Sequence, residues 1–320
     1  MKGGGNVCLT TRKPNWLKWP ENFIRDTLEK VVRLSETLDY INGNPIMKKC
    51  LALKGGTAIN LTVFNLPRLS VDIDLDYCSE ENREEMMFRR KEISEHLKLY
   101  MHTQGYTLSP QSKSRHSLDS FVFSYINLGG IKDNIKVEIN YSLRSHLFEP
   151  EDKRVLPDVI DTKNVITVLQ PIELFAAKIN ALLSRAAVRD LYDTYNMIRA
   201  GLFQNEEYEL LRKAVIFYTS ISQEEIPEKY DVDTIDRISI KKIRTDLLPV
   251  IQKGEFIDLE KIKSRVKEFL AALMVLTAEE QEFLEQFNKK IYAPELLFDD
   301  EQIINRIKSH PMVLWKMQEH

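Results

Sequence analysis

Residues 54–76 read KGGTAINLTVFNLPRLSVDIDLD and contain the most specific pattern in the chain. From Ser70 to Cys78 apolar and polar residues alternate strictly, which predicts a strand, because successive side chains of a strand point to opposite faces. The apolar face of this strand would pack in a core. The opposite face would carry three aspartates together, namely Asp72, Asp74 and Asp76.

These neighbouring carboxylates repel one another, and burying even one of them is costly unless a cation compensates. A bound divalent metal is the usual compensation, and hard oxygen ligands favour magnesium, manganese or calcium. A calcium loop of the EF-hand type is excluded, because its glycine and glutamate positions hold Tyr77 and Arg83. The alternative is a solvated sheet edge, and the apolar opposite face argues against it.

A glycine pair precedes the acidic strand and is followed by a helix-compatible run. It is not a Walker A loop, because Lys54 precedes the glycines instead of following them. Backbone amides at a turn that opens a helix can hold a triphosphate, and carboxylates on an adjacent strand can hold the magnesium that bridges it. We therefore expect Asp72 and Asp74 to ligate metal. The residues expected to hold the phosphates are Gly55, Gly56 and Thr57.

The remaining pattern divides the chain into two halves. Before about residue 165 it predicts helices at 20–41 and 82–104, strands at 117–128 and 131–142, and a short strand at 164–169. From residue 171 onward it predicts helices at 171–185, 188–200, 206–219, 259–275, 278–289 and 301–317. We therefore expect an α+β fold, in which a mixed α/β domain over residues 1–165 is followed by a mainly α-helical domain over residues 166–320.

Four further residues are candidates for the same site. Glu138, in the segment KVEI, is the natural third carboxylate from a neighbouring strand, with Asp76 as the other candidate for this role, although an ordinary glutamate on a sheet face is the alternative. Lys178 lies beside the apolar face of the helix at 171–185 and can either reach inward or remain on the surface. Asp190 and Asp193 share one side of the next helix.

The overall composition excludes several classes of protein. The 320 residues, at 37.4 kDa, suit two domains, and 43% hydrophobic with 29% charged residues is typical of an ordinary globular protein. The net charge of −3 gives no sign of a nucleic-acid or membrane surface as a whole, although it leaves room for a local basic groove. No apolar stretch is long enough for a membrane span. The three cysteines are few and widely spaced, which argues against a disulfide framework or a zinc cluster. We expect a cytoplasmic protein.

Several segments in order resemble the AbiEii/AbiGii-type nucleotidyltransferase toxins of the DNA polymerase β-like nucleotidyltransferase superfamily. They are GGTAINL, RLSVDIDLD, KVEI and ELFAAKINALLSRAAVRDLYD, and PELLFDDEQIINRIKSHPMVLWKM is similar to the end of the family. Two departures stand out. Thr57 occupies a place where the superfamily often has serine, and the interval from Thr57 to Asp72 is long.

The resemblance implies transfer of a nucleoside monophosphate from an NTP to an acceptor hydroxyl, with Mg²⁺ or Mn²⁺ as cofactor. It implies the toxin half of a toxin–antitoxin pair active in phage abortive infection, a separately encoded antitoxin, and tRNA or another RNA as a plausible acceptor. It also places Lys178 and one of Asp190 and Asp193, with Asp193 favoured, at the catalytic site, and Lys54 and Asp190 among the nucleotide-binding residues. The alternatives are transfer to a small molecule or protein, and a catalytically silent nucleotide-binding module.

Overall fold

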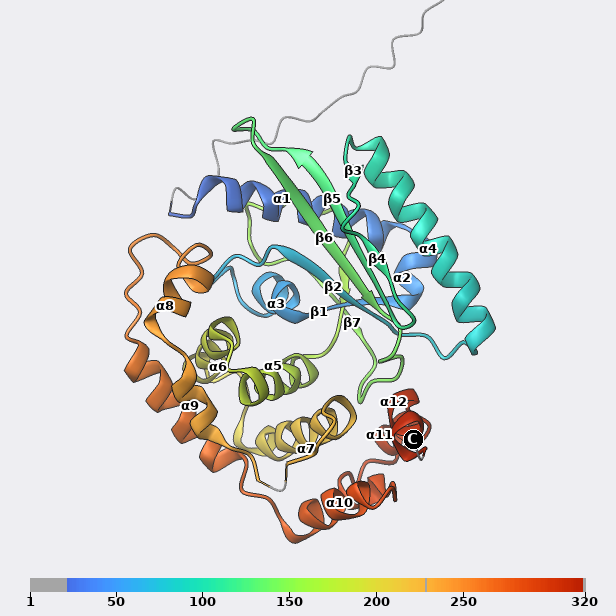
Figure 1. Ribbon diagram of the computed structural model, residues 1–320, viewed down its shortest axis with the longest axis vertical. Coiled ribbons are helices and arrows are strands. Elements are labelled where there is room, and N and C mark those ends of the chain that lie inside the picture. Colours follow the sequence, from blue (N-terminus) through green and yellow to red (C-terminus); the bar gives the residue numbers. More distant parts are fainter. Residues whose placement is uncertain (1–21, 228, 319–320) are drawn as a thin grey trace, which may run out of the picture.

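The computed structural model describes residues 22–227 and 229–318 (Figure 1). A single mixed sheet occupies the N-terminal half, with strands in the order β3-β5-β6-β2-β1-β8-β7 and β4 beside β5. Its strands are β1 (Leu51–Lys54), β2 (Asp72–Tyr77), β3 (Thr107–Leu108), β4 (Lys113–Ser114), β5 (Leu118–Ile126), β6 (Lys132–Asn140), β7 (Glu151–Lys153) and β8 (Ile166–Val168). The β2–β6 and β1–β8 pairs are parallel, and the other pairs are antiparallel.

Helices cover both faces of the sheet. The long helices α1 (Arg25–Gly43) and α4 (Arg83–Thr103) lie on one side of it in Figure 1, with the short α2 (Pro45–Cys50) between them. The other side is met by α3 (Gly55–Ala58), which continues as the π-helical turn η2 (Ile59–Val63) and contacts α5. The glycine turn therefore lies between the sheet and the helical half of the chain.

The C-terminal half is helical, as the sequence predicted. It contains α5 (Pro171–Arg185), α6 (Val188–Ala200), α7 (Asn205–Ser222), η3 (Val232–Arg237), α8 (Ile240–Lys242), η4 (Ile243–Leu247), α9 (Leu259–Leu273), α10 (Ala278–Asn288), η5 (Pro294–Leu296), α11 (Glu301–Ile307) and α12 (Pro311–Met317). Helix α5 packs against both α6 and α7. It starts with a proline at its first position, which is suited to the proline ring.

The predicted fold class is confirmed, and two details differ from the prediction. The helix expected at 301–317 is two helices, because Pro311 cannot continue a helix and instead begins α12. The strand β8 starts at Ile166 and pairs with β1, so the sheet extends past the predicted boundary at residue 165. The division into two domains stays a prediction. None of the described helices is both long and apolar enough to cross a membrane.

Candidate active site

The glycine turn at the end of β1 lies directly against the aspartates of β2. In this antiparallel pair Lys54 is opposite Asp74. Gly55 has a φ of +70°, in the left-handed region that favours glycine, and a Cβ atom on it would lie 2.8 Å from Asp74 Oδ2. The buried Thr57 donates its hydroxyl to the carbonyl oxygen of Asp72. The turn and the acidic strand are therefore packed together, and the absence of a side chain on Gly55 leaves room for a carboxylate.

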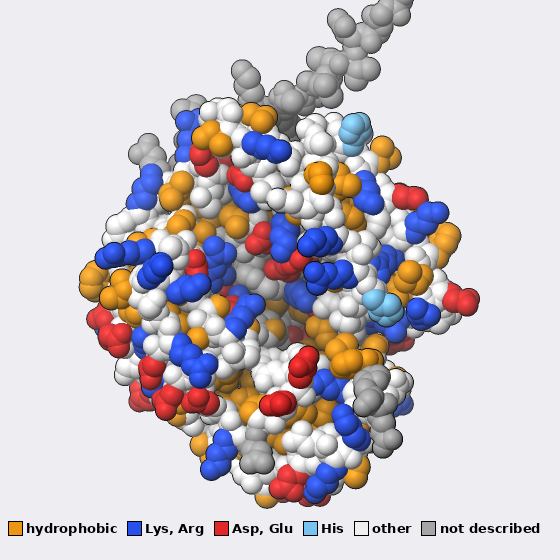
Figure 2. Space-filling model, in the orientation of Figure 1, with side chains coloured by type: hydrophobic (Ala, Val, Ile, Leu, Met, Phe, Trp, Pro, Cys, Tyr) orange, Lys and Arg blue, Asp and Glu red, His pale blue; other side chains and the backbone are white. Residues whose placement is uncertain are grey.

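A cavity of about 380 Å³ lies between this turn and the start of the helical half. Figure 2 shows a hollow in the middle of the same view, with Lys, Arg, Asp and Glu side chains gathered around it. Charges of both signs line the cavity: Arg68, Asp72, Asp74, Lys178, Arg185, Arg189, Asp190 and Asp246, with Gly56, Ser70, Ala187 and Val188 between them. The structure thus brings together residues that are more than a hundred positions apart in the chain.

Half of the predicted site residues border this cavity, namely Gly56, Asp72, Asp74, Lys178 and Asp190. The others contact these residues from outside the cavity lining. They are Lys54, Gly55, Thr57, Glu138 and Asp193. The roles of all ten residues stay predictions.

Asp74 is in an environment that favours the binding of a cation. Burial raises the pKa of Asp74, and repulsion by Asp72 and Glu138 adds to this effect against the attraction of two lysines. Those lysines are held by other carboxylates, at 2.5 Å for Lys54 and 2.8 Å for Lys178. A divalent cation would relieve the repulsion, and carboxylate oxygens are ligands that magnesium and manganese prefer. The donor set of Asp72 and Asp74 therefore fits such an ion.

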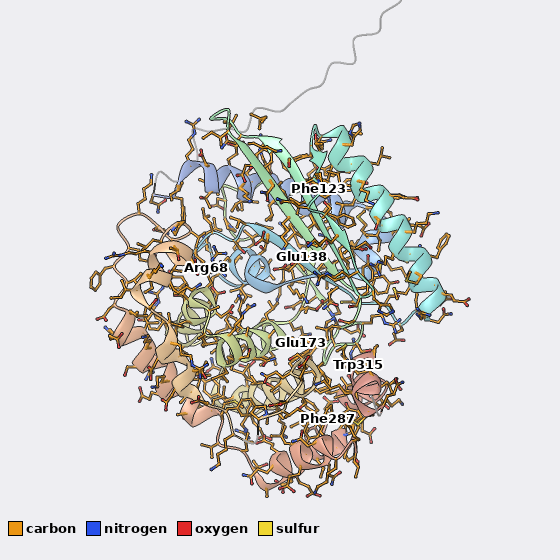
Figure 3. All side chains as sticks on the ribbon, viewed as in Figure 1. Arg68, Phe123, Glu138, Glu173, Phe287 and Trp315 are labelled. Atoms are coloured by element: carbon orange, nitrogen blue, oxygen red, sulfur yellow. The ribbon has the colours of Figure 1, made fainter. Side chains whose placement is uncertain are left out.

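Glu138 stands next to this pair and is bound to a lysine of its own strand. It is the in-register neighbour of Asp74 on the parallel strand β6, so both side chains are on the same face of the sheet. Figure 3 labels Glu138 near the centre of the view. Its Oε2 atom lies 2.9 Å from Lys136 Nζ on its own strand. Within residues 22–227 and 229–318 no three His, Cys, Asp or Glu side chains are arranged to hold a metal ion. Lys136 occupies one oxygen of Glu138, so the other carboxylate oxygen is the one that a metal ion would use.

Lys178 of α5 points into the cavity and is held by two aspartates of α6. Its ammonium nitrogen lies 2.8 Å from Asp190 Oδ1 and 3.0 Å from Asp193 Oδ2. Asp190 also pairs with Arg185, at 2.9 Å, whose side chain is 67% exposed at the mouth of the cavity. The corner between the helices makes this possible, because Ala186 ends α5 in the left-handed conformation and α6 then starts beside it.

Three arginines line the cavity, namely Arg68, Arg185 and Arg189, and the sequence analysis assigned none of them to the site. Arg68 is fully buried and binds Asp193 with two hydrogen bonds, from Nε at 2.7 Å and from Nη2 at 2.6 Å. This pairing, together with Lys178, holds the pKa of Asp193 below its usual range although burial alone would raise it. Arg189 donates from Nε to the carbonyl oxygen of Asp246 at 2.7 Å, and burial and repulsion by Arg68 lower its pKa. The one sequence signal for Arg68 is its isolation as the single charge in VFNLPRLSV.

The third aspartate of β2 belongs to a different group of polar side chains. Asp76 is 1% exposed, binds Lys54 Nζ through Oδ1 at 2.5 Å, and has its Oδ2 atom 3.9 Å from His146 Nε2. On the other side of this ring, Nδ1 is 3.7 Å from Glu173 Oε1, which also accepts the hydroxyl of Tyr218. Burial lowers the pKa of His146 to about 3 and raises that of Glu173 to about 7. Asp76 therefore anchors Lys54 instead of lining the cavity.

These features can be compared with known proteins. A family model described as the nucleotidyl transferase AbiEii toxin of type IV toxin–antitoxin systems matches residues 39–290. The chain belongs to this family. The match includes the glycine turn, Asp72 and Asp74 of β2, and Lys178. This AbiEii-family protein is therefore a nucleotidyltransferase and the toxin of a type IV toxin–antitoxin system, which implies an NTP substrate and a separate antitoxin.

The fold of the AbiEii-family chain is similar to that of a solved relative. MenT4, a nucleotidyltransferase toxin from Mycobacterium tuberculosis H37Rv, matches with a TM-score of 0.59 and 17% sequence identity, over 90% of this chain and 93% of that one. No curated protein matches in sequence. The predicted family, fold class and enzyme class are thus confirmed.

Proposed function

We propose that this AbiEii-family toxin transfers a nucleoside monophosphate from an NTP to a hydroxyl of an RNA, with tRNA as the first candidate, in a reaction that depends on Mg²⁺ or Mn²⁺. The observation that carries the proposal is the convergence on one cavity of Asp72 and Asp74 from β2, the glycine turn after β1, and Lys178 from α5. In the reaction the acceptor oxygen bonds to the α-phosphorus of the NTP. The bond between the α- and β-phosphates breaks, and pyrophosphate leaves.

The two aspartates of β2 are the proposed metal ligands. Asp72 and Asp74 would hold the ion, which when bound polarises the triphosphate and activates the attacking hydroxyl. The raised pKa of Asp74 supports this role, because the carboxylate gains most from a cation where burial and like charges disfavour its ionised form. Glu138 would be a further ligand through the carboxylate oxygen that Lys136 does not hold.

Cationic groups on the opposite wall are the proposed ligands of the triphosphate. Lys178 and Arg189 border the cavity from α5 and α6, and Arg185 stands at its mouth. Preorganised positive charge at this place would stabilise the charge that develops on the leaving pyrophosphate. The backbone of Gly55 and Gly56 would hold phosphate oxygens on the other wall, as the sequence predicted.

Basic residues beside the cavity support an RNA acceptor. Lys241, Lys242 and Arg244 are exposed on α8 and η4, and the neighbouring Asp246 borders the cavity. Figure 2 shows Lys and Arg side chains to the left of the hollow, over the region where Figure 1 draws α6, α8 and α9. The RNA whose phosphates bind to these basic residues would be the acceptor whose end enters the cavity. With these substrates the reaction takes place in the cytoplasm, where the toxin would act in abortive infection.

The test is incubation of the purified protein with each NTP labelled at the α-phosphate, Mg²⁺ and total RNA. Label in the tRNA fraction supports the proposal. Label on protein or on a small molecule would show a transferase with another acceptor, and no label with any NTP would show a silent binding module. Omission of Mg²⁺ and replacement of Asp74 by Asn are the controls.

The proposed RNA surface has a separate test that needs no catalysis. Replacing Lys241, Lys242 and Arg244 together by Gln should weaken tRNA binding and reduce the slope of log affinity against log salt by about 2, because each phosphate of a single strand that is no longer neutralised accounts for about 0.7. Lys91→Gln on α4 is the control, since this lysine is exposed, does not line the cavity and pairs only with Glu95 within the described residues. An unchanged slope would remove this surface from the proposal.

A further inference from the structure

Arg68 is a charged side chain with almost no access to water. It lies in the loop between η2 and β2, and it is 2% exposed. Burying a guanidinium is costly unless its charge and its donors are matched. Asp193 accepts from Nε and Nη2, and the carbonyl oxygen of Leu69 accepts from Nη1 at 3.0 Å. Each nitrogen of the guanidinium group therefore has an acceptor, and the acceptor that balances its charge, Asp193, belongs to α6.

The loop that carries Arg68 is fixed to the helical half by independent contacts. The amide of Leu69 donates to the carbonyl oxygen of Val250 at 2.6 Å. The hydroxyl oxygen of Tyr192 lies 3.2 Å from the carbonyl oxygen of Pro67 and 2.7 Å from Glu255 Oε1, which is the closer acceptor of its one proton. These contacts hold the loop against α6 and the segment after η4. The contacts of Pro67 and Leu69, the two residues that flank Arg68 in the chain, therefore fix the position of its backbone.

The guanidinium also packs on the glycine turn. A Cβ atom on Gly56 would lie 2.5 Å from Arg68 Nη2, so the absence of a side chain there makes room for the arginine. Asn60 links the same two places, because its Nδ2 donates to the carbonyl oxygen of Gly56 at 2.7 Å and its Oδ1 accepts the amide of Arg68 at 3.3 Å. One side chain thus contacts the glycine turn on one side and Asp193 on the other.

Asp193 links Arg68 to Lys178. The Oδ2 atom of Asp193 accepts from Arg68 Nη2 at 2.6 Å and lies 3.0 Å from Lys178 Nζ. Asp193 is 1% exposed and is not part of the cavity lining, whereas Lys178 is. Its place is therefore behind the lysine, where it orients the ammonium group.

The charges of this network give Arg68 a second effect. Three cations, Arg68, Lys178 and Arg185, meet two carboxylates, Asp190 and Asp193, so the network carries a net charge of 3 − 2 = +1. Without Arg68 the sum is 2 − 2 = 0. The charge of Lys178 would then be fully compensated by its two aspartates and less available to a bound anion.

We propose that Arg68 is a positioning residue: it holds Asp193 against the glycine turn, and so fixes the Lys178 ammonium at a set place in the cavity and keeps its positive charge available for a triphosphate. This inference rests on the proposed function in one respect, namely that Lys178 contacts the triphosphate. It assigns no substrate contact to Arg68 itself.

The chain offers a matched control for a test. Arg90 of α4 is also buried, at 7% exposure, and also binds one aspartate twice, Asp119 through Nε at 2.9 Å and Nη2 at 2.7 Å. It does not line the cavity. Arg68→Lys, Arg68→Met, Arg90→Lys and Arg90→Met would be compared in the full chain, at a temperature where circular dichroism shows each variant folded.

The first readout is the binding of inorganic tripolyphosphate by calorimetry, which needs no catalysis. We expect Arg68→Met to weaken binding at least tenfold and Arg68→Lys to weaken it about threefold, because lysine retains the charge but not the paired hydrogen bonds. The Arg90 variants should bind as the unchanged protein does. If Arg68→Met does not fold, the difference between Arg68→Lys and Arg90→Lys decides.

The second readout is the rate at which an acetylating reagent modifies Lys178, measured by mass spectrometry against the exposed Lys91. Arg68→Met should slow this modification severalfold, because Asp193 then no longer shares its charge with Arg68 and holds the Lys178 ammonium group more tightly. Equal effects of the Arg68 and Arg90 variants on both readouts would show a merely structural role and overturn the inference. Lys178→Ala tests the contact of Lys178 with the triphosphate separately from the positioning role of Arg68. Unchanged tripolyphosphate binding in that variant would refute the proposed role of Lys178.

Discussion

The close approach of Gly55 to Asp74 leads to a quantitative prediction for Gly55→Ala. Two effects add in this variant. The left-handed backbone, with φ of +70°, costs a residue with a Cβ atom about 1–2 kcal/mol. The new Cβ atom would also stand 2.8 Å from Asp74 Oδ2, where ordinary contact begins at 3.4 Å, so the carboxylate oxygen must move by 3.4 − 2.8 = 0.6 Å.

The two effects can be separated with a second glycine. Gly130, in the turn between β5 and β6, has φ of +78° and no atom within 4 Å of a Cβ position, so Gly130→Ala measures the backbone strain alone. We expect Gly130→Ala to lose about 1–2 kcal/mol in urea unfolding without metal, and Gly55→Ala to lose at least as much, because the contact with Asp74 adds to the backbone strain. Only Gly55→Ala should also lose function, because a shift of 0.6 Å exceeds the tolerance of roughly 0.2 Å on metal–ligand distances.

The assay is a titration of nucleotide transfer with Mg²⁺. Gly55→Ala should require more Mg²⁺ for half-maximal transfer and should be on the order of tenfold to a hundredfold slower at saturation, as expected for a displacement approaching 1 Å. Gly130→Ala should match the unchanged protein in both respects. Equal Mg²⁺ dependence in the two variants would refute the argument that Gly55 is required by the Asp74 carboxylate.

Three further predictions concern charge. Asp74→Asn should abolish transfer. Its melting temperature without Mg²⁺ should equal or exceed that of the unchanged protein, because burial and repulsion by Asp72 disfavour the ionised carboxylate. A much lower melting temperature would show that the acidic strand has a structural role. Mg²⁺ affinity, measured by calorimetry, should rise with pH through the raised pKa of Asp74, since the metal competes with the proton there, and a flat profile would contradict this. The pKa of Glu173 is raised from 4.5 to about 7, so this carboxyl group binds its proton more tightly in the folded state than in the unfolded state. Its contribution to the free energy of unfolding, about 3 kcal/mol, is therefore present below about pH 4.5 and is lost as the pH rises through 7. Glu173→Gln should remove that decline from the pH profile of urea unfolding, and an unchanged decline would assign it to another group.

The sequence was most informative where a pattern is local. The alternation around Asp72 and Asp74 specifies the strand and the face that carries the carboxylates, because the period of two is a property of the backbone itself. The turn at Gly55 was found for a similar reason, since a left-handed residue next to a strand is restricted to few residue types. Helix boundaries in the C-terminal half followed from proline, as at Pro171, but the same signal was not applied at Pro311, where one predicted helix is two.

Contacts between distant segments could not be predicted in the same way. Nothing local distinguishes Asp190 from Asp193, and only the packing of α6 buries the second of them against Arg68. The same holds for Asp76, which shares the face of its strand with the other aspartates but is turned to Lys54 and His146. Such partners depend on which segments the fold brings together, and a single sequence does not carry that information.

The central claim is that the cavity aspartates support nucleotidyl transfer, and the most direct measurement compares an NTP labelled at the α-phosphate with the same NTP labelled at the γ-phosphate. With Mg²⁺ and tRNA, the account predicts that only the α-label enters the RNA, that the γ-label appears in pyrophosphate, and that Asp74→Asn does neither. Entry of the γ-label into the acceptor, or undiminished transfer of the α-label by Asp74→Asn, would contradict it.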